Sequence, residues 1–436
     1  MDRARGSSCR ASVSCAPGWT YEDIYLVMQA SVLYKLVRLL PEVRMASPLS
    51  PSRRNLLLGA GALTLTPRMA LAQESRAARA DAVARQVMQA PPLQPPALSI
   101  AVADAKGVLW ATALGQANIE AGLAATTQHS FRIGSVSKVV TTAAAAKLVS
   151  RGVLDLDAPI TTWLPDLPAA HHKTTLKQLL THRGGVRHYL ARDFDTAQPG
   201  GAIFQREFAD NAQILAIFIN DPLVFAPGTG LAYSTFGYTL ASIVMEKAAG
   251  KPFLTLLDEE IAKPFALNSL AADAPLAIVP LRANGYSSAV DMGLAVPPAA
   301  AYFYPEGGTA WRNMPYYTSG YCWAGGGLLM NMPDMARFGA ALLDAQGTKI
   351  TAQERALLFT PLTEATGQMP PLGLGWRLDA DGKGRRRFHH AGSTLGGRAN
   401  LVVYPEQGLA IAIASNVLAV PGNVLQPSSE LADIFA

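Results

Sequence analysis

Several features are scarce in this chain of 436 residues. Only 16% of the residues are charged, and no run of eighteen uncharged apolar residues occurs, so a conventional membrane span is not expected. No His-Glu-x-x-His or His-x-His-x-Asp motif is found, and no internal repeat or low-complexity tract is visible. These absences argue against a zinc hydrolase and a repeat protein. With 50% hydrophobic residues, the chain can bury a large core in one or two domains.

The excess of positive charge is confined to the N-terminal part of the sequence. The formal net charge of the whole chain is +5, from 37 basic and 32 acidic residues. Nine basic and four acidic residues precede residue 73, which leaves 28 of each in the remainder. A polyanion-binding surface therefore has no support from the charge balance, and we expect no nucleic-acid partner.

Residues 45–72 have the layout of an export signal. Arg53 and Arg54 precede a short apolar stretch, 56–65, and small residues follow at 70–72, where a signal peptidase would cut. The paired arginines resemble the twin-arginine type of signal and predict a periplasmic protein with no stable membrane span after processing. An ordinary apolar helix behind two surface arginines is the alternative.

Residues 1–44 precede Met45, which is itself a plausible start. We interpret them as a non-native extension from an upstream start codon; a real extension that spoils export is the other interpretation. Two of the three cysteines, Cys9 and Cys15, lie in this extension, so the mature part, residues 73–436, would keep only Cys322 and could form no internal disulfide.

The order of predicted elements indicates an α+β fold. A helix is expected at 76–91, two strands follow around a turn at 104–107, and a long helix runs from the segment 131–140 to Gly152. Helical patterns continue to about residue 270, an irregular lid or wall covers 285–323, and "GGGLLMNMPDMARFGAALL" restores a helix. The C-terminal part is strand-like, with a hairpin turn at 406–408. This order predicts one antiparallel sheet closed by both chain ends, with helices inserted between them.

The segment "FRIGSVSKVV" places Ser135 three residues before Lys138 at the start of the long helix. Residues at i and i+3 share a helix face, so a desolvated lysine could take the proton of the serine hydroxyl. The helix dipole would favour an oxyanion at this end, and Gly134 would let a substrate approach the backbone. A Ser-x-x-Lys pair also arises by chance about once in a chain of this length.

Two further segments carry candidate chemistry. In "FAPGTGLAYSTFGYTL", a Pro-Gly loop delivers Tyr233 to the start of a helix, where a phenol near a lysine could shuttle protons. In "FHHAGSTLGG", His390 offers a donor that titrates near neutral pH, and Gly392 lets the strand backbone lie against a ligand, with the Ser393 amide as an oxyanion donor. Tyr233 alone also fits a half-buried packing residue, and His389 is assigned to a surface or supporting role.

Together these pieces resemble the serine β-lactamase and penicillin-binding-protein superfamily, in its branch of class C β-lactamases, D-Ala-D-Ala carboxypeptidases and esterases. That family carries Ser-x-x-Lys, Tyr-x-Asn and Lys/His-x-Gly in this order. The segments "GVLDLDAPITTWLP", "TTLKQLLTHRGG", "GGGLLMNMPDMARF" and "LGLGWRL" are also similar to recurring family segments. The resemblance covers about residues 80–420.

The resemblance implies a β-lactamase/transpeptidase-like fold and a role for each matching residue. Ser135 would be the acylated nucleophile, and Lys138 and Tyr233 would form the proton-transfer network. His390 would stand beside the oxyanion site, and the backbone amides of Ser135 and Ser393 would form the oxyanion hole. The two-step hydrolysis needs no metal and no organic cofactor. The implied partner is a small-molecule or peptide substrate: a D-amino-acid peptide, a β-lactam or an ester.

Two departures from the family pattern bear on the substrate. Thr235 replaces the asparagine whose amide commonly binds the acyl side-chain carbonyl, and Thr235 together with Gly392 is expected to contact substrate. His390 replaces a lysine that anchors a substrate carboxylate. Arg398 could restore this charge, although a surface arginine is the simpler interpretation. Both departures favour a peptidase or esterase over an efficient β-lactamase.

Two other classes of function compete with an exported serine hydrolase. One is a catalytically idle penicillin- or peptidoglycan-recognition module, against which the joint presence of all three motifs argues. The other is a metallohydrolase using His171, His172 and His182, which no ligand spacing supports. We expect His171 and His172 to be solvated and His182 to be a hydrogen-bonded structural residue at a helix end.

Overall fold

The computed structural model describes most of the chain after residue 74. The described residues are 75–89, 94–197, 201–288, 311–314, 316–344, 346–364, 366, 369–418 and 425–436. The predicted extension 1–44, the predicted export signal 45–72 and much of the expected lid or wall at 285–323 lie outside them. Within the described residues, no helix is long and apolar enough to cross a membrane.

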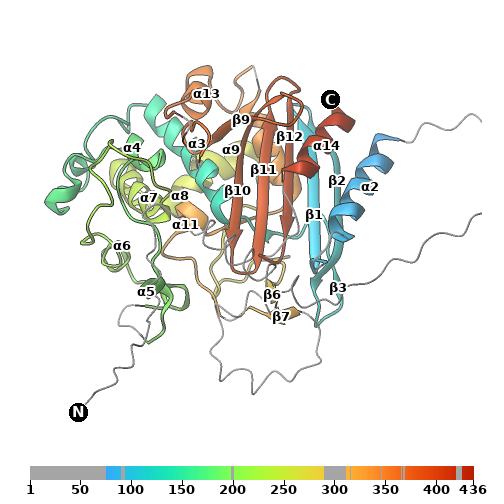
Figure 1. Cartoon of the computed structure of the whole chain (residues 1–436), viewed down its shortest axis with the longest axis horizontal. Coiled ribbons are helices and arrows are strands. Elements are labelled where there is room, and N and C mark those ends of the chain that lie inside the picture. The colour runs from blue at the N-terminus through green and yellow to red at the C-terminus, as the bar shows by residue number, and fades with distance from the viewer. Residues whose placement is uncertain are drawn as a thin grey trace, which may run out of the picture. The chain divides into compact units, whose positions relative to one another are not determined.

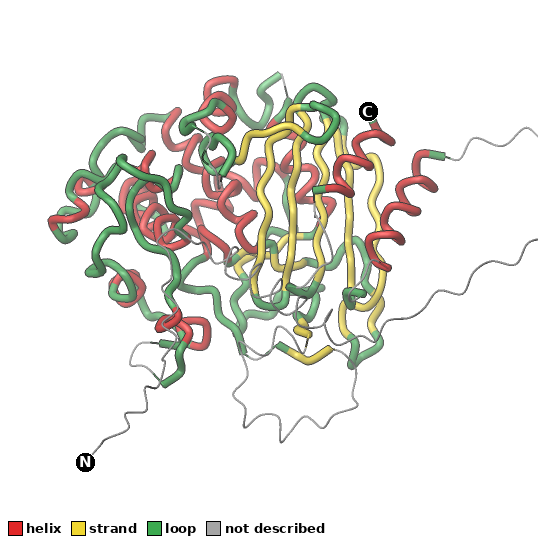
Figure 2. Tube along the Cα trace, viewed as in Figure 1, coloured by secondary structure: helices red, strands yellow, loops and turns green. Residues whose placement is uncertain are grey.

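A seven-stranded antiparallel sheet joins the two ends of the described chain, as the sequence predicts. Its spatial order is β3-β2-β1-β12-β11-β10-β9 (Figures 1 and 2). The strands are β1 (Ala97–Asp104), β2 (Gly107–Asn118), β3 (Leu123–Ala124), β9 (Arg377–Ala380), β10 (Arg386–Thr394), β11 (Gly397–Tyr404) and β12 (Leu409–Ser415). The central pairing of β1 with β12 brings segments about 300 residues apart into register, with Ile100 opposite Ile413.

The two faces of the sheet bury side chains of different size. In β1, the large residues Leu98, Ile100 and Val102 pack under the terminal helices α2 (Arg76–Gln89) and α14 (Gln426–Phe435). The alternate positions are three alanines and Ser99, and they face α12 (Met332–Leu342), which lies on the other side of the sheet. Small side chains let α12 approach closely: a Cβ on its Gly339 would stand 2.9 Å from the Cβ of Ala410. This alternation follows from the two-residue period of a strand.

The segment between β3 and β9 consists of helices joined by long loops and covers the α12 side of the sheet (Figure 1). Helix α3 (Ser137–Ser150) is its buried centre, because valines and alanines occupy nearly its whole circumference. The other helices of this segment are α4 (Leu176–Leu180), α5 (Ala191–Phe194), α6 (Asn211–Leu215), α7 (Thr235–Ala249), α8 (Phe253–Leu257), α9 (Lys263–Phe265), α11 (Trp323–Gly326), α12 and α13 (Ala352–Phe359). Short strands also occur here: β4 (Phe131–Arg132), β5 (Ala271–Ala272), β6 (Tyr286–Ser288), β7 (Trp311–Asn313) and β8 (Leu328–Met330).

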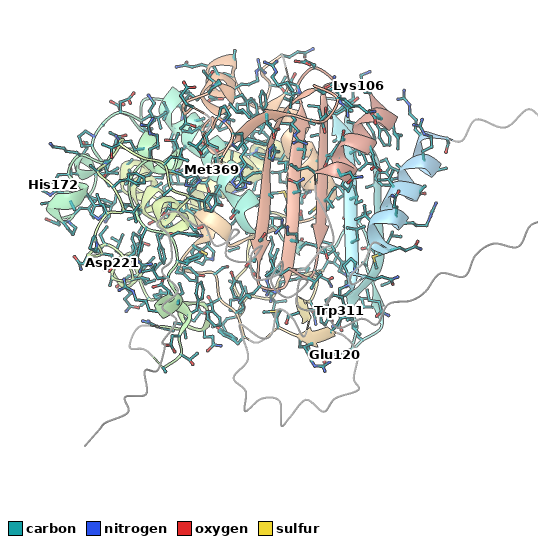
Figure 3. The ribbon with its side chains drawn as sticks, viewed as in Figure 1. Lys106, Glu120, His172, Asp221, Trp311 and Met369 are labelled. Atoms are coloured by element: carbon teal, nitrogen blue, oxygen red, sulfur yellow. The ribbon has the colours of Figure 1, made fainter. Side chains whose placement is uncertain are left out.

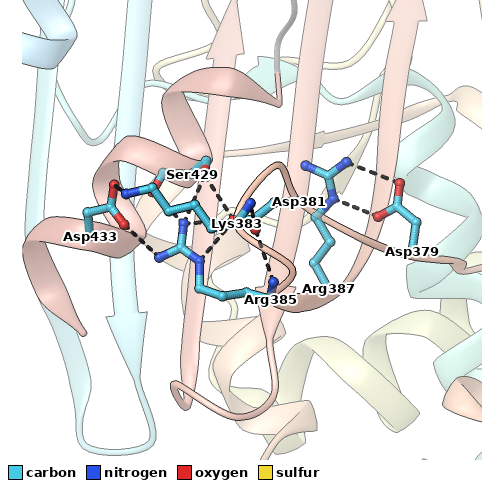
Figure 4. Close-up of polar contacts among 7 residues, drawn as sticks. All are labelled: Asp379, Asp381, Lys383, Arg385, Arg387, Ser429 and Asp433. Carbon is cyan, nitrogen blue, oxygen red and sulfur yellow. Dashed lines mark hydrogen bonds and ion pairs between the residues drawn. The ribbon is translucent and has the colours of Figure 1, made fainter.

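Two elements differ from the sequence-based expectation. The segment expected to restore a helix starts in the last residues of α11 and continues as strand β8, which pairs with β4 and β5 before α12 starts. The C-terminal helix α14 was not predicted. It is tied to the turn between β9 and β10, where Arg385 binds both Asp381 and Asp433 (Figure 4). Ser429 donates to the same buried Asp381 carboxylate, so the helix is held by charge as well as by apolar packing.

Candidate active site

Ser135 lies in a short 3₁₀ turn, Gly134–Val136, directly before α3. Gly134 has φ +50°, in the left-handed region that favours glycine. The backbone of β10 lies next to Gly134: a Cβ on Gly134 would stand 2.8 Å from the Ser393 nitrogen. The space beside Gly134 is therefore taken by protein rather than left for a substrate. The turn presents Ser135 half-exposed, while Ser137 is fully buried and donates to the Gly134 carbonyl.

Lys138 is completely buried one turn along from Ser135. Its Nζ lies 3.1 Å from Ser135 Oγ, 3.2 Å from Thr235 Oγ1 and 2.6 Å from the Gly325 carbonyl oxygen. A buried amino group needs such partners because its desolvation is costly. A neutral amine has two N–H donors and one lone pair. Donation to Gly325 and Thr235 would leave the lone pair for the Ser135 hydroxyl, which is the arrangement of a general base.

Tyr233 lies beside Lys138, at the start of α7. Lys138 Nζ is 4.7 Å from the centroid of the Tyr233 ring, within the range of a cation–π contact when the lysine is protonated. The ring of His390 lies 6.3 Å from the same centroid. The structure therefore gathers the predicted residues Ser135, Lys138, Tyr233 and His390, which come from three distant segments.

Strand β10 lies against the turn that carries Ser135. A Cβ on Gly392 would stand 1.9 Å from the Ile133 carbonyl oxygen and 3.0 Å from the Ser135 nitrogen. Since no side chain fits there, the backbones of residues 133–135 and 392–393 meet directly. This close approach is what an oxyanion hole formed by the Ser135 and Ser393 amides requires.

His390 is buried, and its Nδ1 lies 2.7 Å from the Ala391 carbonyl oxygen. A carbonyl only accepts, so Nδ1 carries the proton and Nε2 keeps its lone pair. Burial lowers the pKa of His390 well below its usual value, and the charges of Arg377 and Lys138 lower it further. The expectation that His390 titrates near neutral pH was wrong, because its surroundings hold the ring neutral.

Two arginines lie near the third motif. Arg377, the first residue of β9, places its guanidinium carbon 6.0 Å from the centroid of the Tyr233 ring. Arg398, across the hairpin from Ser393, is half-buried and donates to Ser393 Oγ. Arg398 is the arginine that the sequence offered as a replacement for the missing lysine. Arg377 was missed, although it belongs to the quoted segment "LGLGWRL".

Two further histidines belong to the site. The His182 ring lies 4.4 Å from the Tyr233 ring, and the His188 ring lies 5.4 Å from it. The structural role expected for His182 agrees with its bond to the Ser234 backbone, but its place beside Tyr233 was not foreseen. His188 was not considered at all. The sequence indicated a role for His182 and His188 only through the position of "LLTHRGGVRHY" within the region that resembles the family.

The remaining histidines have other roles. His172 is exposed, as expected, and lies at the surface far from the sheet (Figure 3). The expectation for His171 was wrong, because it is buried and its Nε2 lies 3.0 Å from the Ile219 carbonyl oxygen. His389 is also buried rather than at the surface, with its Nε2 3.3 Å from the Asp379 carboxylate. Among the described residues, no group of three or more His, Cys, Asp or Glu side chains could hold a metal ion.

This combination defines a class of protein. The serine β-lactamase and penicillin-binding-protein superfamily has an antiparallel sheet built from both chain ends and an inserted helical region. Its members also carry a Ser-x-x-Lys helix that faces a tyrosine loop and a His-x-Gly strand. The chain belongs to the Beta-lactamase family, whose model matches residues 80–427.

Relatives of known name agree with this assignment. Esterase EstB of Burkholderia gladioli is 32% identical over 282 residues, which cover 60% of this chain and 69% of the esterase. Human serine beta-lactamase-like protein LACTB, mitochondrial, is 25% identical over 388 residues, covering 70% of this chain and 68% of LACTB. The D-amino acid amidase of Ochrobactrum anthropi SV3 has a similar fold, with a TM-score of 0.67 at 22% identity, covering 81% of this chain and 97% of the amidase.

Proposed function

We propose that this protein hydrolyses amide or ester bonds through an acyl-enzyme formed on Ser135. The observation that carries the proposal is the buried Lys138 amino group, 3.1 Å from Ser135 Oγ and beside the Tyr233 ring. Burial of a lysine amino group costs free energy even when hydrogen bonds offset part of the cost. A buried lysine beside a half-exposed serine therefore favours a catalytic role over a purely structural one.

The proposed acylation begins with neutral Lys138. Its lone pair accepts the Ser135 proton while Ser135 Oγ attacks the substrate carbonyl carbon, and the Ser135 and Ser393 amides stabilise the resulting oxyanion. Collapse of this intermediate breaks the bond to the leaving amine or alcohol, which takes its proton from Lys138 through the Tyr233 hydroxyl. In the second step, a water molecule passes a proton through the Tyr233 hydroxyl to neutral Lys138 and attacks the acyl carbon. Collapse of this intermediate breaks the bond between Ser135 Oγ and the acyl carbon, releases the acid, and returns the proton from Lys138 to Ser135 Oγ.

We assign the substrate to peptides or esters rather than to efficiently hydrolysed β-lactams. Thr235 Oγ1 accepts a hydrogen bond from Lys138, so the Thr235 hydroxyl proton remains available to donate to a substrate carbonyl. This is one hydrogen bond, whereas the asparagine of the family pattern offers a whole amide group. His390 is held neutral and supplies no fixed charge for a carboxylate. The similarity to an esterase and the shared fold with a D-amino acid amidase support this assignment.

A catalytically idle recognition module is the competing function, and one experiment separates the two. Purified protein is incubated with p-nitrophenyl acetate, nitrocefin, D-Ala-D-Ala peptides and D-amino-acid amides, and adducts are sought by mass spectrometry. We expect turnover of at least one ester or amide, an adduct on Ser135, and loss of both in Ser135→Ala. A Ser135→Ala protein with unchanged turnover would refute the assignment of the nucleophile. A wild-type protein with neither adduct nor turnover would favour the recognition module.

We also propose that the protein acts after export to the periplasm. The support is the arrangement of Arg53-Arg54, the short apolar stretch and the small residues at 70–72. Fractionation of cells that express the chain from Met45 tests this. Replacement of both arginines by lysine should leave the protein in the cytoplasm, and unchanged periplasmic recovery would contradict a twin-arginine route.

A further inference from the structure

His182 contacts the backbone on both sides of Tyr233. The Ala232 amide donates to the His182 carbonyl oxygen at 3.0 Å, and the Ser234 amide donates to His182 Nδ1 at 3.2 Å. A single residue thus holds the backbone immediately before and immediately after the tyrosine. The left-handed conformation of His182, φ +61°, follows helix α4 and is unusual for a residue other than glycine.

His188 makes the equivalent contact one residue further along. The Thr235 amide donates to His188 Nδ1 at 3.2 Å. Thr235 opens α7, and amides in the first turn of a helix have no partner within the helix. Ser234 caps the same end, because its Oγ accepts from the Gly237 amide. His188 therefore acts as an additional cap for the helix that carries Thr235 toward Lys138.

A buried ion pair holds the segment that carries His188. Arg187 binds Asp193, with Nη1 2.7 Å from the carboxylate, and also donates to the His188 carbonyl oxygen at 2.9 Å. The Arg187 carbonyl oxygen in turn accepts from Ser234 Oγ at 2.8 Å. Since Arg187 and Asp193 are both almost fully buried, His188 is attached to a buried, ion-paired part of the fold.

Acceptance by Nδ1 requires both imidazoles to be neutral with the proton on Nε2. Burial lowers the pKa of His182 well below its usual value, and positive charge on the neighbouring Lys138 and Arg377 lowers it further. Burial, with the charges of Lys138 and Arg187, lowers the pKa of His188 to about 3. The electrostatics therefore agree with the hydrogen-bond geometry.

We propose that His182 and His188 are positioning residues that hold the Tyr233–Thr235 backbone in reach of Lys138 by accepting the Ser234 and Thr235 amides. This inference rests on the proposed function, because it assigns a purpose to the placement of Tyr233 in acyl transfer. Displacement of a proton-transfer group by about 1 Å can cost on the order of 10²-fold in rate. Loss of either acceptor should therefore reduce kcat more than it changes KM.

Asparagine and leucine variants test the acceptor directly. The Oδ1 of asparagine lies as many bonds from Cα as histidine Nδ1, and asparagine tolerates the left-handed conformation. His182→Asn and His188→Asn should retain kcat within about fivefold, whereas His182→Leu and His188→Leu should lose about 30- to 100-fold. His182→Gly removes the acceptor without backbone strain and should resemble His182→Leu. His172→Leu, a change at an exposed histidine, should leave activity unchanged.

A double-mutant cycle separates positioning from general destabilisation. If His182 acts through Tyr233, His182→Leu should cost less than about threefold in a Tyr233→Phe background, where the shuttle is already absent. An equal loss in both backgrounds would overturn the proposal. Asparagine variants as inactive as the leucine variants, in protein whose circular dichroism is native, would also overturn it. Failure of the proposed function itself is recognised separately, by turnover that survives Ser135→Ala.

Discussion

The contact between β10 and the turn that carries Ser135 can be tested by adding a single methyl group. Gly392→Ala would place its Cβ 1.9 Å from the Ile133 carbonyl oxygen and 3.0 Å from the Ser135 nitrogen. Gly392 does not have a positive φ, so the backbone conformation itself accepts alanine. The expected effect is therefore steric.

The size of the effect follows from the overlap. A carbon and an oxygen that are not bonded rarely approach closer than about 3.0 Å, so the strand and the turn must separate by roughly 1 Å. Both clashing groups are backbone, and neither can rotate away as a side chain would. Overpacking of this kind costs about 1–3 kcal/mol of stability. Separation of the two oxyanion donors by 1 Å should cost about 10²- to 10³-fold in kcat.

The assay compares Gly392→Ala with Gly382→Ala in ester hydrolysis, Ser135 acylation and urea unfolding. Gly382 lies in the turn between β9 and β10 of the same hairpin, and a Cβ there would meet nothing within 4 Å. We expect wild-type behaviour for Gly382→Ala, and loss of acylation with a folded protein for Gly392→Ala. A Gly392→Ala protein with wild-type kcat would refute both the close approach and the oxyanion hole built on it.

Two further predictions concern stability. His182 and His188 have pKa values lowered from 6.5, to about 3 for His188, so below pH 6.5 the unfolded chain binds protons that the folded chain does not. The free energy of unfolding should have its full value above pH 6.5. As the pH falls toward 3, His188 should lower it by about 1.4 kcal/mol per pH unit and His182 should lower it further, so the slope should be smaller in His188→Asn. Urea titrations that show no such fall would contradict this. Asp193→Asn leaves the buried Arg187 with Asp221 alone and should cost about 3 kcal/mol in the same assay, and a cost below 1 kcal/mol would argue against the pair as an anchor.

Local spacing made part of the site predictable. Ser135 and Lys138 lie three residues apart, and a helix puts such residues on one face wherever it is placed. The turns at 104–107 and 406–408, each between strand-like segments, likewise predicted strands of one sheet. The helix α14 was not predicted because it is short and its attachment depends on Asp381, more than forty residues earlier. The sequence predicts a helix at β8 because the three residues of this strand directly precede a strong helical pattern.

The roles of single histidines were the least predictable part. His171 and His172 are adjacent in the sequence, yet one is buried against a distant carbonyl and the other is exposed. A histidine carries no periodic signal, and its protonation follows from burial and from charges that other segments supply. Hence His188 and Arg377 could not be recognised before the segments around Tyr233 were placed.

The sequence by itself determined which groups are available for chemistry and in what order they occur, because motif order and helix periodicity are properties of the chain. It also determined that Thr235 and His390 depart from the family pattern. Only the tertiary structure decided that His390 is neutral, that His182 and His188 accept the amides around Tyr233, and that Arg377 lies beside that ring. The reason is physical: desolvation and hydrogen bonding depend on which atoms surround a group, and here those atoms come from segments distant in the sequence.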